Sequence, residues 1–580
     1  MPTSHDPHDE AADLDRAADF TDPSEADSEE IAPDQLEAIQ QLAAAAGIPD
    51  AHIPRDGNAV EAALAAAGLG FSDFEHDEDG EEDDTPLTGE LRVDDQGLTL
   101  PIGAAAEESS QEPVSAEDLA ALAQVEAELD SRWSEVTIDP SLSRMEELMD
   151  ILGSPQLAYP TIHVAGTNGK TSTVRMIESL VRAFARRTGR TTSPHLQLVT
   201  ERIAIDGVPL SPKDYVRTWR EIQPYVEMVD ARSEAAGGPR MSKFEVLTAM
   251  AFAAFADAPV DVAVVEVGLG GRWDATNVVR SDVAVITPVG LDHQDYLGET
   301  IEEIAAEKAG IIKPRWDMGD LLTPPDNVAI VGAQEPAAMK VILERAVEAD
   351  AAVARFGQEF GVIDSSLAVG GQRISLKGLG GEYEDIFLPL AGEHQAANAA
   401  CALAAVEAFF GAGPGRLLDH DRVREGFAAV ESPGRLERVR ATPTVFVDAT
   451  HNPHGAKALA KALDRDFDFR RLIGVVAVLG DKDARGILDA LEPVLTEVVI
   501  TENSSPRALP AEELAEMARE IFGEERVHVA DTLTGAVALA VELAEESDEP
   551  GGQVSGSGVI VTGSVVTAGE ARTLFGKDPA

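Results

Sequence analysis

The sequence predicts an α/β protein with two parallel-sheet domains behind an acidic extension. Short β-branched runs alternate with amphipathic stretches over residues 115–436, and a second alternation of the same kind covers residues 437–580. Strands that alternate with helices are typical of parallel sheets with helices on both faces. At 580 residues the chain is also too long for a single core, so two or three domains are expected.

Residues 1–114 are predicted to be a disordered acidic N-terminal extension. They carry 31 acidic residues against three arginines, in a chain with a formal charge of −58. The run EHDEDGEEDD repels itself and cannot bury apolar surface. Two patches, DQLEAIQQLAAAAGI and NAVEAALAAAGLGF, read either as transient helices or as docking elements. The overall negative charge argues against nucleic acid or an anionic membrane as a partner.

The cysteine content points to a reducing compartment, and we expect a cytoplasmic protein. Cys401 is the single cysteine, so no disulfide can form within the chain. It lies in the apolar run CALAAVEAFF and is expected in the core rather than as a nucleophile. The acidic N-terminus does not resemble a signal peptide, and no apolar run is long enough to span a membrane.

The elements of the first domain follow in order from the patterns. A helix is expected from Ser115, which opens a capping-box pattern with the acidic residues behind it. Strands are expected at 161–165, 260–267 and 282–289. Helices are expected at 170–187, 212–232, 243–257, 299–309, 336–349 and 393–410.

The second domain is expected to start near residue 437, with the preceding Pro-Gly-Arg as the hinge. Its predicted strands are TVFVDA, RLIGVVAVLG, TEVVIT and GVIVTG, and a helix runs through GAKALAKAL.

The stretch HVAGTNGKTST has the context of a phosphate-binding loop, because it follows a strand and opens a helix. Backbone N–H groups of Thr167 to Thr171 and the helix N-terminus would hold anionic oxygens. Lys170 would neutralise the β- and γ-phosphates, and Thr171 or Ser172 would reach a bound metal. The usual P-loop has four residues where this chain has only Thr167 and Asn168. The alternative is a glycine-rich turn with a solvated lysine.

Carboxylates and histidines follow the next strands. Glu266 ends one strand, and Asp292 with His293 follows another. In a doubly wound sheet, ligands bind at the carboxyl ends of the strands, so these groups are suited to Mg²⁺. Lys308 lies on the next predicted helix and reads as an exposed lysine unless it turns toward this edge. The second domain has a polar strand end of its own, formed by Asp448, His451 and Asn452.

Together these segments resemble the folylpolyglutamate synthase/dihydrofolate synthase family, a branch of the Mur ligase superfamily, over about residues 116–577. The motifs that carry the resemblance are HVAGTNGKTS, TSPHL, FEVLTAMAF, EVGLGGRWDATN, LDHQDYLGETIEEIAAEKAGIIK, GEHQAANA, SPGRLE and DATHNP. The resemblance implies a P-loop Mur-ligase-type central ATPase domain (115–436) and a smaller Rossmann-like α/β C-terminal domain (437–580). The shortened P-loop is the version found in that superfamily.

The resemblance also implies an activity. The γ-phosphoryl group of ATP would pass to a carboxylate of dihydropteroate or a folate, and the amino group of L-glutamate would attack the acyl phosphate. ATP and Mg²⁺ are the implied co-substrate and metal. The implied partners are small-molecule substrates, with no nucleic acid and no membrane, and the protein is expected to be a monomer.

Site residues are carried over by their motifs. The implied nucleotide-binding residues are Gly166, Thr167, Asn168, Gly169, Lys170, Thr171, Ser172, Asn398, Arg435 and Asp448. Ser193, Glu266 and His293 are the implied metal ligands. Lys170, Lys308 and His451 are the implied catalytic residues, Lys308 matching a lysine that is carbamylated in relatives. The implied folate-binding residues are Phe244, Glu245, Trp273, Asp274 and Ala275.

Some positions depart from the family pattern, and alternatives stay open. Thr171 stands where relatives usually have glycine, and Ala449 with Thr450 stands where the family often has Gly-Ala. The last strand lacks an aromatic residue that is common there. A different Mur-type amino-acid-adding ligase is the nearest alternative, and a nucleotide-dependent switch or scaffold is another. The sequence does not decide between dihydrofolate synthesis, glutamate extension, or both.

Overall fold

The structure is a computed structural model that describes residues 92–94, 97–99, 114–133, 140–314, 327–546 and 556–579. The chain divides into two units, Met1–Ser110 and Gln111–Ala580. In the first unit, β1 (Arg92–Asp94) and β2 (Gly97–Thr99) pair as an antiparallel hairpin that the sequence did not suggest. The disorder and the two helical patches predicted within residues 1–114 otherwise fall outside the described residues and stay predictions.

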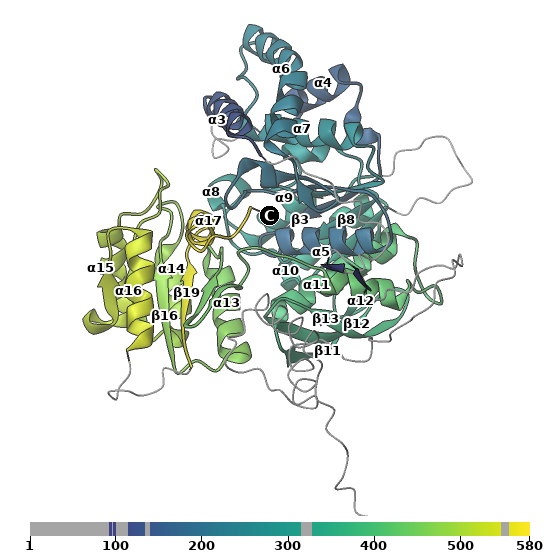
Figure 1. The fold of residues 1–580 in the computed structure, drawn as a ribbon. Coiled ribbons are helices and arrows are strands. Elements are labelled where there is room, and N and C mark those ends of the chain that lie inside the picture. Colours follow the sequence, from purple (N-terminus) through teal and green to yellow (C-terminus); the bar gives the residue numbers. More distant parts are fainter. Residues whose placement is uncertain are drawn as a thin grey trace, which may run out of the picture. The chain divides into compact units, whose positions relative to one another are not determined.

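The central sheet of the second unit carries the P-loop (Figure 1). Its strand order is β10-β9-β8-β3-β7-β4-β5-β6, parallel from β10 to β4 and antiparallel at β5 and β6. The strands are β3 (Thr161–Ala165), β4 (Thr188–Thr191), β5 (Ile203–Ile205), β6 (Val208–Pro209), β7 (Val262–Glu266), β8 (Val283–Ile286), β9 (Val328–Val331) and β10 (Ala352–Arg355). β3 lies between β7 and β8, so the three predicted strands are neighbours.

Alternate side chains of each strand pack into two different hydrophobic cores, because successive side chains point to opposite faces of the sheet. Val262 and Val264 of β7 pack with α5 (Lys170–Ala183), α11 (Glu393–Phe409) and α12 (His420–Ala428). Ala263 and Val265 pack on the other face, with α3 (Ala116–Asp130), α4 (Ser143–Ile151), α6 (Pro212–Ala235) and α7 (Lys243–Asp257). On that same face α8 (Gln294–Leu297), α9 (Ile301–Ala309) and α10 (Pro336–Glu348) cover β8 and β9.

A three-stranded antiparallel sheet adds to the first of these cores. It is formed by β11 (Gly361–Ala368), β12 (Gly371–Lys377) and β13 (Glu382–Leu388). Ile374, Leu376 and Tyr383 point from it into the cluster that contains α11. This sheet was not predicted, because its strands carry many polar residues on their outer face.

The second large sheet has the order β14-β15-β19-β16-β17-β18, with only β14 antiparallel. Its strands are β14 (Glu437–Ala441), β15 (Thr444–Val447), β16 (Arg471–Val476), β17 (Glu497–Ile500), β18 (Val527–Val529) and β19 (Ser557–Thr562). One face packs on α13 (Pro453–Asp466), α14 (Ala484–Leu491) and α15 (Ala511–Phe522). The other packs on α16 (Leu533–Glu545) and α17 (Val565–Leu574).

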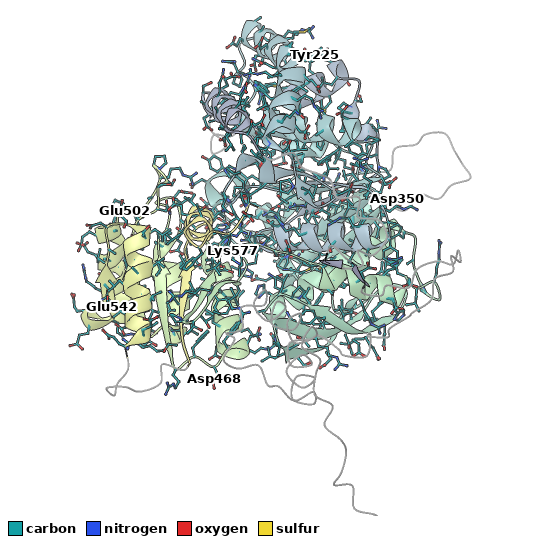
Figure 2. All side chains as sticks on the ribbon, viewed as in Figure 1. Tyr225, Asp350, Asp468, Glu502, Glu542 and Lys577 are labelled. Atoms are coloured by element: carbon teal, nitrogen blue, oxygen red, sulfur yellow. The ribbon has the colours of Figure 1, made fainter. Side chains whose placement is uncertain are left out.

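The predicted elements are confirmed with small shifts at their ends. Helix α7 has the predicted bounds, and the helix predicted at 170–187 ends at Ala183. The capping box of α3 is present, with Asp118 at the third position. Strand β4 was missed because its sequence, TGRT, has no apolar residue although all four residues are buried. Asp350, Asp468, Glu502 and Glu542 are exposed acidic side chains of this unit (Figure 2).

Candidate active site

The loop between β3 and α5 is shaped by two glycines. Gly166 has φ +150° and Gly169 has φ +85°. A Cβ on Gly166 would lie 1.8 Å from Thr287 Oγ1, and one on Gly169 would lie 2.6 Å from Asn398 Oδ1. Only glycine fits both places, so the chain can turn closely past Thr287 and Asn398 into the N-terminus of α5, where an anion can bind.

The loop is tied to the segment that follows β8. The Thr167 N–H donates to Pro288 O at 3.0 Å. Thr167 Oγ1 donates to Gly290 O and accepts from the Gly290 N–H, each at 3.0 Å. Lys170 Nζ donates to Thr167 O at 3.2 Å, so the ammonium group lies over the loop.

Glu266 lies at the end of β7, beside the start of α5. Its Oε1 accepts from Thr171 Oγ1 at 2.9 Å, and the nearby Ser193 backbone helps to lower its pKa. Its Oε2 is buried and has no hydrogen-bond partner among the described residues. Burial raises the pKa of Glu266, and Lys170 and Thr171 oppose that rise. A buried carboxylate oxygen without a partner is an incomplete arrangement that a cation would complete.

Lys308 is not an exposed helix lysine. Only 4% of it is exposed, and its Nζ donates to Gly166 O at 2.9 Å. Burial lowers its pKa to about 7, and Lys170 adds to the effect. A large fraction of this amine is therefore neutral near neutral pH.

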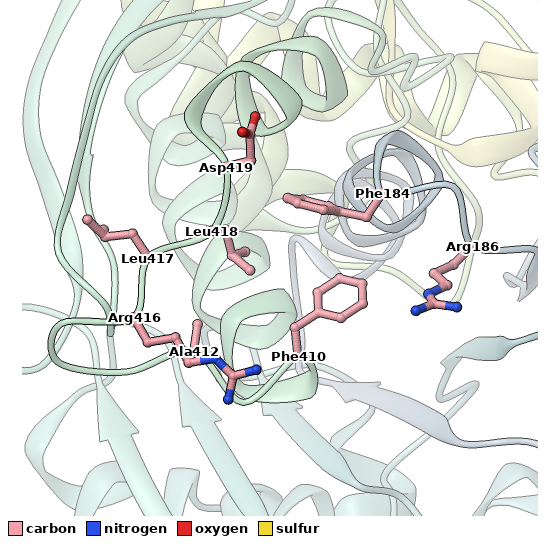
Figure 3. A pocket seen from close by; sticks show the side chains of 8 residues that line it. All are labelled: Phe184, Arg186, Phe410, Ala412, Arg416, Leu417, Leu418 and Asp419. Atoms are coloured by element: carbon pink, nitrogen blue, oxygen red, sulfur yellow. The ribbon is translucent and has the colours of Figure 1, made fainter.

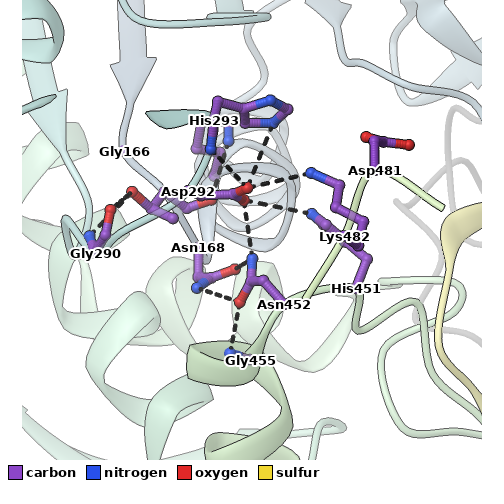
Figure 4. Close-up of polar contacts among 12 residues, drawn as sticks. Gly166, Asn168, Gly290, Asp292, His293, His451, Asn452, Gly455, Asp481 and Lys482 are labelled. Carbon is purple, nitrogen blue, oxygen red and sulfur yellow. Dashed lines mark hydrogen bonds and ion pairs between the residues drawn. The ribbon is translucent and has the colours of Figure 1, made fainter. Parts of the chain in front are cut away.

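Asp292 collects groups from both large sheets (Figure 4). Lys482 Nζ, on the loop after β16, lies 3.1 Å from Asp292 Oδ1. Asn452 Nδ2 donates to Asp292 Oδ2 at 3.1 Å, and His451 Nε2 lies 4.0 Å from the same oxygen. The His293 N–H donates to Asp292 Oδ1 at 2.9 Å. The polar strand end of the second sheet therefore meets the edge of the first sheet here.

Asn168 completes this connection to the P-loop. Its amide and that of Asn452 exchange hydrogen bonds of 3.2 and 3.3 Å. Asn168 Nδ2 also lies 2.8 Å from His454 Nδ1. His454 and Lys482 were not singled out from the sequence, although the polar run GDKD after β16 is the same kind of strand-end signal as DATHNP.

The charges around Asp292 follow from burial. Burial opposes ionisation of Asp292, but His293, Lys482 and His451 outweigh it, and its pKa lies well below the usual range. Burial lowers the pKa of both His293 and His451. Of these three neighbours, Lys482 makes the shortest side-chain contact with Asp292, at 3.1 Å.

The other predicted nucleotide residues lie near the loop or at the hinge. Asn398 is buried beside Gly169, and its Nδ2 donates to Gln395 Oε1 at 3.1 Å. Asp448 accepts from the Leu436 and Thr450 N–H groups at 2.8 and 2.9 Å, which fixes the hinge to β15.

Arg435 is half-buried and donates to Gly434 O at 3.2 Å. Its positive charge acts to lower the pKa of both Glu266 and His451.

The predicted folate-binding residues come from two segments that touch. A Cβ on Gly268 would lie 2.4 Å from the Phe244 ring, so Phe244 packs against the loop that carries Trp273, Asp274 and Ala275. Both carboxylates of the set are buried. Asp274 accepts from the Leu269 N–H at 2.8 Å and from the Thr276 N–H at 3.0 Å.

Glu245 is held within the fold. It accepts from the Ser242 N–H at 2.7 Å and pairs with Arg144 Nε at 3.1 Å.

The part of the chain that the structure describes has no group of three His, Cys, Asp or Glu side chains arranged for a metal. A Mg²⁺ site does not need one, because it commonly uses one or two carboxylates with waters and substrate phosphates. In the same described residues, no helix is long and apolar enough to cross a membrane.

A surface pocket of about 320 Å³ includes Phe184, just after the C-terminal end of α5, whereas the P-loop lies at the start of that helix. Figure 3 shows its lining residues. Phe184, Arg186, Phe410, Arg416, Leu417 and Asp419 line it, and none of the predicted site residues does.

Comparisons with known proteins agree with this geometry. The Mur ligase middle domain matches residues 226–406, and the Mur ligase glutamate ligase domain matches residues 434–564. A dihydrofolate synthase/folylpolyglutamate synthase of Mycobacterium tuberculosis is 61% identical over 470 residues, covering 80% of this chain and 96% of that protein. The corresponding Escherichia coli protein is 36% identical over 385 residues, covering 66% of this chain and 82% of that one.

Solved structures give the same result. The structure of M. tuberculosis folylpolyglutamate synthase complexed with ADP has a TM-score of 0.75 at 60% identity, covering 80% of this chain and 100% of that one. The structure of E. coli FolC in complex with DHPP and ADP has a TM-score of 0.65 at 32% identity, covering 78% of this chain and 97% of that one. With the P-loop, the glutamate ligase domain and this similarity along most of its length, the chain belongs to the folylpolyglutamate synthase/dihydrofolate synthase family of Mur ligases.

Proposed function

We propose that this protein is an ATP-dependent ligase that joins the amino group of L-glutamate to a carboxylate of dihydropteroate or of a folate. The observation that carries the proposal is the meeting of a P-loop with the strand end of a glutamate ligase domain, through Asp292, Asn452 and Asn168. That junction brings the ATP side and the amino-acid side of a ligation together.

The reaction has two steps. A carboxylate oxygen of the pteroate substrate attacks the γ-phosphorus of ATP, and ADP leaves. The amine of glutamate then attacks the carbonyl carbon of the acyl phosphate, the amine loses its proton, and inorganic phosphate leaves. Both steps bring negative oxygens together, so positioning and charge neutralisation supply most of the catalysis.

The P-loop residues are proposed to hold the nucleotide. The N–H groups at the N-terminus of α5, from Gly169 to Ser172, are proposed to bind the phosphates, while those of Thr167 and Asn168 donate to Pro288 O. Lys170 supplies positive charge over the loop. Asn398, Arg435 and Asp448 complete the nucleotide site, and ADP in the structures of two relatives supports this assignment. His451 is proposed to lie near the transferred phosphoryl group.

The residues present fit Mg²⁺. The buried Oε2 of Glu266 lacks a partner, and Ser193 and Thr171 are its polar neighbours. We propose Ser193, Glu266 and His293 as ligands, and bound Mg²⁺ would offset the negative charge of the phosphates and the attacking carboxylate. Lys308, as its carbamate, would replace a positive charge by a negative one beside the P-loop.

The pteroate substrate is proposed to bind along Phe244 and the Trp273–Ala275 loop. We also propose that residues 115–436 and 437–580 form the ATPase and glutamate ligase domains. The protein is expected to act as a monomer in the cytoplasm on small molecules alone, with neither nucleic acid nor membrane as a partner.

The experiment is a substrate comparison. Purified protein with Mg²⁺, ATP and L-glutamate is offered dihydropteroate, tetrahydrofolate or a UDP-muramyl peptide precursor, and ADP and the amide product are both measured. Amide formation is expected with one or both pteridines. Amide formation only with the muramyl substrate would make it another amino-acid-adding ligase, and ADP release without any amide would indicate a switch or scaffold.

A further inference from the structure

We propose that Asp292 and Lys482 form an ion pair that positions the strand-end loops of the second sheet on the P-loop for ligation. The inference rests on the proposed function and gives a role to two residues outside the proposed ligands and catalytic groups. Both are positioning residues, since they act through Asn452, His451 and Asn168.

The pair joins segments 190 residues apart in the chain. Lys482 Nζ donates to Asp292 Oδ1 at 3.1 Å, and the two side chains are only 9% and 11% exposed. An ion pair that is mostly removed from water loses hydration free energy. Only well-aligned attraction and hydrogen bonds between the two groups can offset that loss. Such a pair is a poor source of stability but a strong constraint on how two elements meet.

Lys482 does not pair with the acid next to it in the chain, Asp481, because Asp481 pairs with an arginine instead. Asp481 Oδ1 pairs with Arg507 Nη2 at 2.7 Å. The loop after β16 therefore turns Asp481 toward Arg507 and Lys482 toward Asp292. Figure 4 shows Asp481 pointing away from the contacts around Asp292.

The other oxygen of Asp292 carries the constraint to the P-loop. Asn452 Nδ2 donates to Asp292 Oδ2, and the Asn452 and Asn168 amides exchange hydrogen bonds. Asn452 Oδ1 also accepts from the Gly455 N–H at 2.8 Å and so caps α13. Through Asn452, the Asp292 carboxylate thus holds the N-terminus of α13 against the phosphate-binding loop.

Loss of Lys482 would leave the mostly buried Asp292 without its nearest cationic side chain. The carboxylate would then turn toward water or draw in another partner, and Asn452 and His451 would shift with it. A displacement of about 1 Å between reacting groups costs roughly 100-fold in rate, so kcat is expected to fall by about that factor while the KM for ATP changes little.

The test is a double-mutant cycle on the full chain with Asp292→Asn, Lys482→Met and both changes together. Steady-state kcat and KM are measured for ATP and glutamate with dihydropteroate, and the thermal unfolding midpoint is recorded for each variant. Each single change is expected to lower kcat, and the double variant should be no worse than the poorer single one, because both remove the same contact. Lys482→Arg should keep more activity than Lys482→Met.

A matched control is the pair between Lys461 and Glu393. It also joins α13, which packs on the second large sheet, to the start of α11, which packs on the central sheet. Its two side chains, however, are 67% and 50% exposed. Lys461→Met is expected to leave kcat and KM unchanged, since exposed pairs contribute little.

Hydrogen exchange gives a second readout that needs no substrate. Residues 450–455 should exchange faster in Lys482→Met than in the parent, and should be unchanged in Lys461→Met. If the parent protein makes no amide from a pteridine, the proposed function fails. Hydrogen exchange still tests whether the Asp292–Lys482 pair holds residues 450–455 in place. Three results would each overturn the inference: additive losses of kcat in the cycle, a raised KM for glutamate with unchanged kcat, and unchanged hydrogen exchange in Lys482→Met. A Lys482 variant that unfolds at lower temperature but keeps a normal kcat would overturn it as well. Should Asp292→Asn not fold, Asp292→Glu takes its place in the cycle.

Discussion

Lys308 shows how burial changes what one side chain can do. An ammonium group is a poor neighbour for Mg²⁺, because like charges repel strongly where water is excluded. The buried Nζ of Lys308 contacts Gly166 O, and its pKa is lowered to about 7. A neutral amine can add CO₂, and the resulting carbamate is an anion with the oxygen ligands that Mg²⁺ prefers.

We therefore expect Lys308→Ala and Lys308→Arg to be nearly inactive. A small carboxylate such as acetate should restore part of the rate of Lys308→Ala, because it fills the vacated oxygen positions. Arginine occupies the space and stays charged, so Lys308→Arg should resist rescue. Turnover with and without acetate checks this, and a Lys308→Arg enzyme that works like the parent would contradict it.

The same lysine predicts a pH dependence. The fraction of neutral amine increases as the pH rises through the lowered pKa of about 7. The carbamate signal from isotope-labelled bicarbonate, measured by NMR, should therefore increase between about pH 6 and pH 8. A signal that is absent, or that persists in Lys308→Ala, would show that this amine is not carbamylated.

Glu266 is expected to matter for turnover and not for folding. Its Oε2 is buried without a partner, so the carboxylate costs stability in the protein without metal. Glu266→Ala should lose most turnover while its thermal unfolding midpoint stays equal to or above that of the parent. His293→Ala should behave similarly, since 40% of that side chain is exposed. Near-normal rates at saturating Mg²⁺ in either variant would rule out its assignment as a ligand.

The strand–loop–helix element at the P-loop depends on a close approach at Gly169. Gly169 has φ +85°, and a Cβ added there would lie only 2.6 Å from Asn398 Oδ1, so both its conformation and its surroundings exclude a side chain. Gly169→Ala is expected to lose ATP affinity at least tenfold, measured by isothermal titration. Gly153 is the matched control, since it has φ +79° but a Cβ at that position would meet nothing within 4 Å. Gly153→Ala should cost about 1–2 kcal/mol of unfolding free energy and leave ATP affinity intact.

Helix α7 starts at a buried charge pair, which makes a structural role for Glu245 testable. Glu245→Ala removes the partner of both the Ser242 N–H and Arg144, so unfolding free energy should fall by about 3–5 kcal/mol. Glu245→Gln keeps the cap and should lose less. Denaturant unfolding measures both. Unchanged stability combined with a raised KM for dihydropteroate would instead support direct substrate contact.

At the level of the whole molecule, the first unit is expected to be dispensable for ligation. Every predicted site residue lies beyond residue 160, within the unit Gln111–Ala580. Deletion of residues 1–110 should leave kcat within about twofold of the parent and the unfolding midpoint nearly unchanged, because so acidic a segment supports no core of its own. Loss of most turnover in the truncated protein would show that the extension is part of the enzyme.

The link between the two large sheets also involves the C-terminal helix. Gln197 Nε2, four residues after Ser193, donates to Thr573 Oγ1 of α17 at 3.1 Å. Arg572 of the same helix donates to Glu437 Oε2 at 2.8 Å, next to the hinge. The loop that carries a proposed metal ligand is therefore held by a helix nearly 380 residues away in sequence.

The sequence by itself determined the local elements and the family. β3, β7 and β8 are short apolar runs, α7 has clear helical spacing, and the Gly-Lys loop lies between a strand and a helix, so each is readable within a few residues. Local signals failed where burial does not follow apolar composition. β4 is polar yet buried, and β11 and β13 carry consecutive polar residues that interrupt the alternation expected of a strand.

Only the tertiary structure decided which distant side chains meet. Lys308 reads as a surface lysine until the packing of α9 brings it to Gly166, and the strand-end run GDKD does not reveal that Lys482 meets Asp292. Hydrophobic periodicity reports which face of an element is buried, but it does not say what lies opposite that face. Contacts between loops at two sheet edges depend on strand order and on the docking of whole layers, and these are set by the summed packing of residues far apart in the chain.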